Sequence, residues 1–344
     1  MRGVAHPERP DRVEVVAARL RESGLLTQTI PARDATDAEI ERIHTAEYLE
    51  LVERETSGLT NPRYLSTGDT VVDARSYAAA RRAAGGAIVA VETSAGNGEA
   101  VFALVRPPGH HAEPARGMGF CLFNNVAIAA RAYQSSRVTL SPSTPLRTGL
   151  VEGGRVLIAD FDYHHGNGTE AVAGHGLSYF STHAYPAYPG TGATSYRRGS
   201  DIVLNVPLPA VEIPTETFVA IWEQMLPIVA QAVRPDLLIV SAGFDYVAGD
   251  SVGDLGVGVE AAAPLAAAIR RTAEEHCHGS VAYVLEGGYD LDALTGSIAS
   301  IIVVSDASQT PPVAADPKAV PREMLHRTKA MLRNSQGGTQ GATN

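Results

Sequence analysis

The stretch VLIADFDYHHGNGT, residues 156–169, joins an apolar run to a dense polar cluster. Its first four residues are continuously apolar, as in a parallel strand that helices cover on both faces. The ten residues that follow contain two carboxylates, two imidazoles and two glycines. Burying charged groups is costly unless they are paired or bind a metal ion. The stretch therefore predicts a buried strand that ends in a functional site.

Three further apolar runs resemble this strand, over residues 101–105, 237–240 and 281–285. Helical stretches lie between the runs, including residues 214–233 and 260–276. Strands that alternate with helices form parallel sheets with helices on both faces. We therefore expect an α/β fold with a single doubly wound, mostly parallel sheet.

Other helices are predicted where apolar residues recur at helical spacing. They cover residues 13–23, 78–93 and 124–133, and Asp37 is the expected N-cap of another. The pair Gly85-Gly86 is expected to interrupt the second of these helices.

The chain is expected to form one domain over residues 1–333. Residues 134–154 are rich in Ser, Thr, Pro and Gly, which predicts a surface loop inserted in that domain. Residues 334–344 form a polar, glycine-rich tail that we expect to be disordered.

Composition excludes several classes of protein. The apolar runs are far shorter than the ~20 residues needed to cross a bilayer, and no leader pattern opens the chain. Two cysteines do not make a disulfide framework, which favours a cytoplasmic location. The net charge of −10 argues against a nucleic-acid-binding protein and mildly favours cationic ligands, although many cytoplasmic proteins are acidic for solubility alone.

Polar clusters follow all four predicted strands. They are RPPGHH with His110 and His111, DFDYHHGNG with Asp162 and His164, SAGFD with Asp245, and EGGYD with Tyr289. In open parallel sheets, ligands bind at the carboxyl ends of the strands. We therefore expect the four clusters to converge on one site.

Asp162, His164 and Asp245 have the chemistry of a metal site. The first two are spaced i, i+2, so they can point the same way from an extended or turning segment. With Asp245 they offer three ligands and leave a position open, which suits a catalytic Zn²⁺, with Fe²⁺ or Co²⁺ as alternatives. A lone Asp-x-His is as readily a turn with a surface histidine. The second aspartate and the tandem histidines favour the metal site.

His110 and His111 can form a proton-shuttling pair if each ring is oriented by an acceptor. Asp160 and Asn167 are the expected partners. Tyr289, in a glycine turn, can donate to a developing oxyanion, a role worth roughly 2.7–4 kcal/mol. The alternative is a tyrosine that merely packs over the turn.

These residues lie in motifs that resemble the histone deacetylase superfamily, of the arginase-deacetylase fold. Seven motifs stand in family order: HPERPDR, RPPGHHA, GFCLFNN, DFDYHHGNGT, YPGTG, SAGFD and EGGYDL. Asn167, where other branches carry Asp, is similar to the class II branch, which includes bacterial-type deacetylases and relatives of acetylpolyamine amidohydrolases. The resemblance implies a zinc-dependent amidohydrolase that removes an acetyl or similar acyl group by attack of metal-activated water.

The resemblance also implies a role for each matching residue. Asp162, His164 and Asp245 would bind zinc, His111 would act as base and acid, and His110 would act chiefly through its charge. Asp160 would orient His110, Asn167 would be the partner of His111, and Tyr289 would stabilise the transition state. Gly119, Phe120 and Tyr188 would form a narrow tunnel, and a structural K⁺ would lie at the 160–164 loop near Ser181 and Thr182.

The expected substrate is a peptide or small-molecule N-acyl amine, such as acyl-lysine. Acetylpolyamine is the main alternative. It is disfavoured because Val252 is neutral where polyamine-selective members can place an acidic residue, and because the chain lacks their dimerising insertion near the N-terminus. A binuclear manganese ureohydrolase would need further aspartates in the metal loop. A non-catalytic acyl-ligand-binding protein is disfavoured because the set of site residues is complete.

Overall fold

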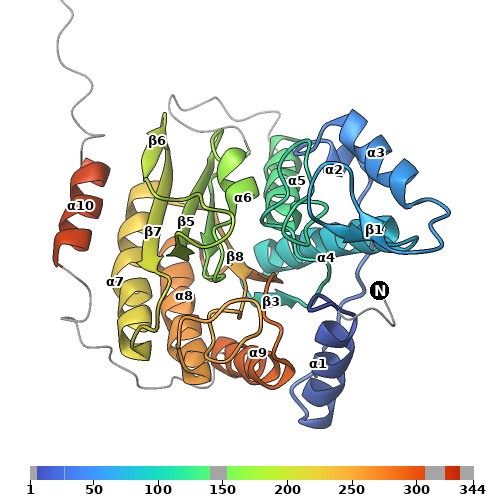
Figure 1. Ribbon diagram of the computed structural model, residues 1–344. Helices are drawn as coiled ribbons and strands as arrows, with labels where there is room; N and C mark the ends of the chain where they lie inside the picture. The colour runs from blue at the N-terminus through green and yellow to red at the C-terminus, as the bar shows by residue number, and fades with distance from the viewer. Residues whose placement is uncertain (1–5, 27, 140–152, 307–321, 334–344) are drawn as a thin grey trace, which may run out of the picture.

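The computed structural model describes residues 6–26, 28–139, 153–306 and 322–333. A seven-stranded sheet runs in the order β3-β9-β8-β4-β5-β7-β6, and every neighbouring pair is parallel except β6–β7 (Figure 1). The strands are β3 (Ala100–Ala103), β4 (Val156–Asp160), β5 (Leu177–Tyr185), β6 (Tyr196–Arg198), β7 (Asp201–Pro209), β8 (Leu237–Ala242) and β9 (Val281–Leu285). A separate small sheet pairs β1 (Arg63–Tyr64) with β2 (Val71–Val72). The predicted α/β fold with a mostly parallel sheet is confirmed.

The four apolar runs correspond to β3, β4, β8 and β9, but the prediction omitted β5, β6 and β7. Strand β5 has the sequence LSYFSTHAY, and all but its last residue are buried. Its Ser, Thr and His side chains interrupt the apolar pattern that marks a buried strand. These polar groups are tolerated because they hydrogen-bond, as Ser181 Oγ does with His183 Nδ1 at 2.9 Å.

Helices cover both faces of the sheet (Figure 1). The helices are α1 (Asp11–Glu22), α2 (Asp37–Ile40), α3 (Ala46–Thr56), α4 (Ser76–Asn97), α5 (Asn125–Thr139), α6 (Asn167–Ala171), α7 (Thr215–Val233), α8 (Ala262–His276), α9 (Leu291–Ser305), α10 (Arg322–Arg333) and the 3₁₀ turn η1 (Val259–Ala261). Residues of α1, α7, α8 and α9 pack on one face against Leu157 and Ala159. Residues of α2–α5 pack on the other face against Val156 and Ile158. Strand β4 is therefore buried on both sides, as its sequence predicts.

Two local predictions were wrong. Helix α4 continues through Gly85, where a Cβ would collide with the backbone of Arg33 and Ala35. This glycine permits close packing of a neighbouring segment and does not break the helix. The N-cap of α2 is Thr36, not Asp37, and Thr36 forms a reciprocal capping box with Glu39.

The expected loop at 134–154 begins later than predicted, because α5 extends to Thr139. Residues 140–152 and the expected disordered tail at 334–344 lie outside the described residues. None of the helices described is both long and apolar enough to span a bilayer.

Candidate active site

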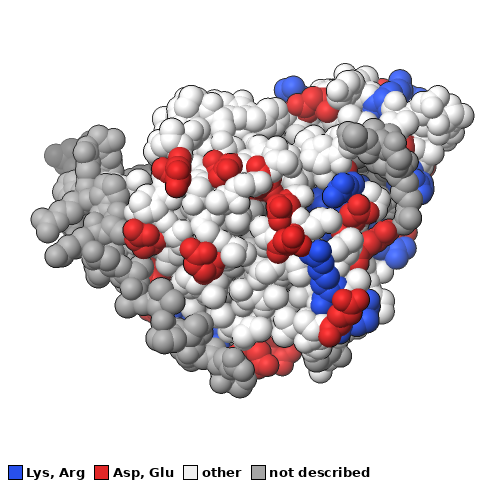
Figure 2. All heavy atoms as spheres, turned by 60° about the horizontal axis from the view of Figure 1, so that its bottom comes forward, with Lys and Arg blue, Asp and Glu red and all other residues white. Residues whose placement is uncertain are grey.

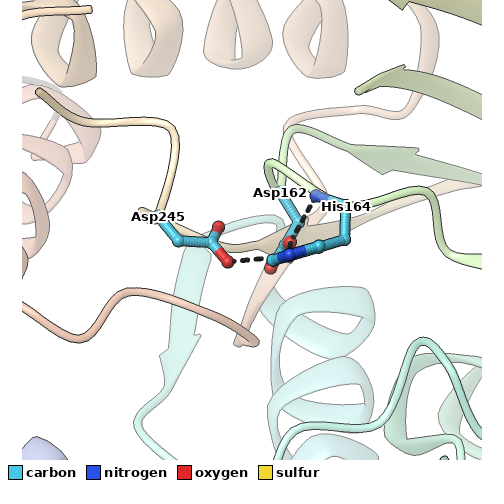
Figure 3. A group of neighbouring side chains, drawn as sticks. All are labelled: Asp162, His164 and Asp245. Carbon is cyan, nitrogen blue, oxygen red and sulfur yellow. Dashed lines mark hydrogen bonds and ion pairs between the residues drawn. The ribbon is translucent and has the colours of Figure 1, made fainter. Parts of the chain in front are cut away.

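Asp162, His164 and Asp245 come together where β4 and β8 end. Figure 3 shows the three side chains turned toward one another from two separate loops. One potential ligand atom from each lies within 4.8 Å of the others. His164 Nδ1 is 3.2 Å from Asp162 Oδ1 and 3.0 Å from Asp245 Oδ2. The two carboxylates are 0–1% exposed, so this is a buried cluster of mixed nitrogen and oxygen donors.

Backbone amides hold both carboxylates in place. Asp162 accepts from the N–H of His164 and from that of Gly287, each at 2.8 Å. Asp245 Oδ1 accepts from the N–H of Tyr163 at 3.0 Å. A Cβ on Gly287 would collide with the carboxylates of Asp245 and Asp162. Gly287, the first glycine of EGGYD, is therefore required because the backbone approaches the cluster so closely.

The electrostatics of the cluster favour a bound cation. Burial raises the pKa of Asp245, and the neighbouring Asp162 carboxylate raises it further, to about 6. Burial opposes a charge on His164, but its bonds to the two carboxylates outweigh burial and raise its pKa to about 9. A divalent cation would relieve the repulsion between the carboxylates more fully than one proton does. Asp162, His164 and Asp245 therefore fit a metal ion with an open coordination position.

His110 and His111 lie beside this cluster with their ring centroids 4.1 Å apart. His110 Nδ1 contacts Asp160 Oδ2 at 3.1 Å, and His111 Nδ1 contacts Asn167 Oδ1 at 2.8 Å. Each ring thus has the acceptor that the sequence predicts for it. Both histidines are buried, and the His111 ring lies 5.7 Å from that of His164.

The two rings have opposite electrostatic environments. Burial opposes a charge on His110, but the carboxylates of Asp162 and Asp160 raise its pKa to about 10. Burial lowers the pKa of His111, and the charges of His110 and His164 lower it well below its ordinary value. These surroundings therefore favour a charged His110 ring and a neutral His111 ring.

Two residues that were not predicted from the sequence, Glu286 and Tyr179, support this pair. Glu286 Oε2 accepts from the backbone N–H of Gly109 at 2.6 Å and from that of His110 at 3.1 Å. The Tyr179 hydroxyl donates to Asp160 Oδ2 at 3.0 Å and accepts from the Gly166 N–H at 3.1 Å. Glu286 could have been predicted because it is the first residue of EGGYD. Tyr179 lies in β5, a strand that the apolar pattern did not predict.

Two of the predicted tunnel residues, Gly119 and Tyr188, lie against the His111 ring. The Tyr188 ring is edge-on to that of His111 at 5.2 Å, and a Cβ on Gly119 would collide with the His111 ring. Gly119 and Phe120 both have positive φ, of 58° and 67°. Asp69 links the two walls, since it accepts from the Gly119 N–H at 2.8 Å and from the Tyr188 hydroxyl at 3.0 Å. Asp69 was not predicted, because nothing in its own segment marks it.

Tyr289 is packed between two groups at the same edge. Its ring lies 5.9 Å from that of Phe120 and 4.6 Å from the Arg12 guanidinium carbon. Arg12 is fully buried and donates to the carbonyl of Gly288 at 2.7 Å. Arg12 of HPERPDR is thus part of the site, although no role was predicted from the sequence for the residues of that motif. Burial raises the pKa of Tyr289 well above 10, which keeps its hydroxyl protonated.

The fold and these contacts agree with a family model that matches residues 6–304, described as the histone deacetylase domain. The chain belongs to the histone deacetylase family. It is 35% identical over 311 residues to histone deacetylase 15 of Arabidopsis thaliana. The matched region covers 87% of this chain but only 52% of that protein. This chain thus spans about half of that relative's length.

Two further comparisons extend the similarity within the family. A Synechocystis protein, slr0245, is 36% identical over 307 residues, covering 86% of this chain and 92% of that one. The crystal structure of the HDA15 HD domain matches with a TM-score of 0.78 and 33% identity, covering 98% of this chain and 89% of that chain. The matched region therefore includes the sheet and the segments that carry all four strand-end clusters.

Proposed function

We propose that this chain is a zinc-dependent deacetylase that hydrolyses the amide of an acyl-lysine or a related N-acyl amine. The observation that carries the proposal is the unequal histidine pair beside a buried Asp-His-Asp cluster. The membership of this chain in the histone deacetylase family supports the proposal. The reaction needs a neutral base next to a Lewis acid, and His111 beside Asp162, His164 and Asp245 offers that combination.

Asp162, His164 and Asp245 would hold the zinc ion. When bound, Zn²⁺ polarises the scissile carbonyl and lowers the pKa of a bound water to roughly 7. Asn167 Oδ1 accepts at His111 Nδ1, so the proton of the neutral ring is on Nδ1 and the lone pair is on Nε2. We propose that His111 Nε2 accepts the proton of the attacking water and later delivers it to the leaving amine.

His110 and Tyr289 would stabilise the negative charge that develops. Asp160 holds His110 through Nδ1, and the raised pKa of this ring keeps a positive charge beside the reacting centre. The protonated Tyr289 hydroxyl would donate to the oxyanion. Phe120 and Tyr188 would hold the alkyl chain of the substrate between two aromatic faces.

Acyl-lysine is favoured over acetylpolyamine as the substrate because Val252 carries no charge to bind a distant amine. Acidic side chains are spread over the face shown in Figure 2, and Lys and Arg gather mainly in its right-hand part. With the net charge of −10, this distribution favours a basic peptide over an acidic one.

Three further expectations belong to the same proposal. Residues 1–333 would form one catalytic domain. A structural K⁺ would bind at the 160–164 loop near Ser181 and Thr182. The two free, buried cysteines, Cys121 and Cys277, suit a reducing compartment such as the cytoplasm.

The test is a comparison of two substrates with a single preparation. The protein is stripped of metal, reloaded with one equivalent of Zn²⁺, and assayed on an acetyl-lysine peptide and on N-acetylputrescine. We expect turnover of the peptide that disappears on stripping and returns with zinc. Faster turnover of N-acetylputrescine would favour the polyamine alternative. Full zinc binding without turnover of either substrate would contradict deacetylase activity.

A further inference from the structure

Asp250 contacts four backbone amides with one buried carboxylate. Its Oδ2 accepts from the N–H of Tyr289 at 2.6 Å and from that of Asp290 at 3.0 Å. Its Oδ1 accepts from the N–H of Val252 at 2.9 Å and from that of Gly253 at 3.4 Å. The side chain is only 9% exposed. Both oxygens are therefore committed to the protein, each to a different segment.

The segment that carries Tyr289 needs such a support. Two glycines precede Tyr289, and Gly288 has a φ of 108°, which only glycine adopts freely. A turn of this kind does not fix the direction of the next residue by itself. Arg12 holds the Gly288 carbonyl at 2.7 Å, and Asp250 holds the following N–H from another element. Hydrogen bonds to an ionised carboxylate are roughly twice as strong as neutral ones.

The other Asp250 oxygen, Oδ1, binds the loop that contains Val252 and Gly253, which we call the rim loop. Val252 and Gly253 lie in the loop after β8, and a Cβ on Gly253 would collide with the Tyr163 ring. Tyr163 in turn donates its N–H to the ligand Asp245 at 3.0 Å. The Asp250 carboxylate thus connects the rim loop, which lies against the metal loop, to the backbone of Tyr289.

We propose that Asp250 is a positioning residue for the reaction: it fixes the Tyr289 backbone relative to the rim loop, so that the hydroxyl meets the developing oxyanion. The inference rests on the proposed deacetylase function and adds a residue to it. Asp250 touches neither substrate nor metal in this account. Its loss should therefore lower kcat through Tyr289 and leave substrate binding nearly unchanged.

The chain offers a matched control in the same loop. Asp254 also accepts from two backbone amides, Gly249 N–H at 2.9 Å and Gly256 N–H at 2.7 Å. It has no bond to Tyr289 among the described contacts. Asp250→Ala and Asp254→Ala therefore remove the same kind of loop hydrogen bond, but only the first frees the Tyr289 backbone.

The experiment measures kcat and KM on an acetyl-lysine peptide for zinc-loaded wild type, Asp250→Ala, Asp254→Ala, Tyr289→Phe and the Asp250→Ala/Tyr289→Phe double variant. Misplacing a catalytic group by about 1 Å can cost about 10²-fold, so we expect a kcat loss of that order for Asp250→Ala with little change in KM. In the Tyr289→Phe background, the same substitution should lower kcat by less than about threefold. Asp250→Asn keeps one acceptor oxygen and should restore part of the activity.

Several results would overturn the inference. One is an equal kcat loss from Asp250→Ala with and without the Tyr289 hydroxyl, and another is the same loss from Asp254→Ala. Backbone amide exchange gives a second readout that does not require turnover. Exchange at Tyr289 and Asp290 should become faster in Asp250→Ala and not in Asp254→Ala, and unchanged exchange would contradict the proposal. Wild type without turnover would instead refute the proposed function, so the two failures are distinguishable.

Discussion

Two pairs of buried histidines have similar ring geometry but differ in what surrounds them. The rings of His110 and His111 are 4.1 Å apart, and those of His165 and His183 are 4.6 Å apart, with similar tilts of 49° and 53°. The first pair faces the carboxylates of Asp160 and Asp162. In the second pair, His165 Nε2 lies 2.8 Å from the Glu170 carboxylate, and His183 contacts the Ser181 hydroxyl and the Gly192 carbonyl.

The neighbours decide the charge of each ring. In the first pair, nearby carboxylates overcome burial and raise the pKa of His110 to about 10, while the pKa of His111 falls. In the second pair, burial and the neighbouring His165 lower the pKa of His183 to about 3. Proximity of two imidazoles therefore does not make an acid–base pair. Each pair has a carboxylate beside one of its rings. The first pair differs in that it also contacts the metal cluster, where His110 Nε2 lies 3.8 Å from Asp162 Oδ1.

The largest effect is expected from removing a carboxylate of the metal cluster. Asp245→Asn removes a negative ligand, and losing several kcal/mol of Lewis-acid stabilisation corresponds to a fall in kcat/KM on the order of 10³-fold. The matched change beside the second pair, Glu170→Gln, should leave the rate nearly unchanged. Bound zinc and deacetylation rate are measured together for both variants. Comparable losses of bound zinc and deacetylation rate in the two variants would contradict the difference proposed between the two histidine pairs.

The next effect is expected at the base itself. His111→Gln removes the proton acceptor, and general base catalysis contributes roughly 10²–10⁴-fold to the rate. His183→Gln changes an imidazole of similar burial that has no role in the proposed reaction. Steady-state kinetics of both variants on the acetyl-lysine peptide should show a large kcat loss only for the first. A His111→Gln enzyme of wild-type kcat would disprove the assigned base.

A smaller effect, on stability, should distinguish the pairs by pH. The pKa of His183 is lowered to about 3 in the folded state, so the unfolded chain binds its proton first as the pH falls below about 6.5. The stability that neutral His183 contributes is therefore present above pH ~6.5 and is lost as the pH falls toward the folded-state pKa. Between pH ~6.5 and ~4.5 this amounts to about 2 kcal/mol.

Denaturant unfolding at several pH values measures this contribution. His183→Gln should show a shallower loss of stability with acid than wild type, by about 2 kcal/mol over that interval. Carboxylates that titrate in the same range cancel in the difference between the two proteins. Parallel curves for the two proteins would mean that His183 is not held neutral.

Sequence predicted the parts of the molecule that depend on local pattern. The strands β3, β4, β8 and β9 contain continuous apolar runs, and each chemical cluster follows one of them. For this reason, and because the motifs stand in family order, the metal cluster and the partners of His110 and His111 could be predicted from the sequence. Strand β5 could not be predicted, because its buried hydroxyls and His183 give it the sequence of a polar segment.

The supporting residues were missed for a different reason. Glu286 binds the amide of Gly109, Asp69 binds that of Gly119, and Asp250 binds that of Tyr289. Each bond joins a side chain to a backbone group far away in the sequence. Such an N–H is present in every residue except proline, so no side-chain pattern marks the recipient. Only the folded chain shows which amides lack a local partner.

The most direct test of the central claim is the rate of acetate release from an acetyl-lysine peptide by zinc-matched wild type and Tyr289→Phe. The substitution removes one hydroxyl and leaves the metal cluster and the histidine pair intact. We predict turnover by wild type and a loss of about 10²–10³-fold in kcat for the variant at equal zinc content. Equal rates for the two proteins, or no acetate from zinc-loaded wild type, would contradict the account.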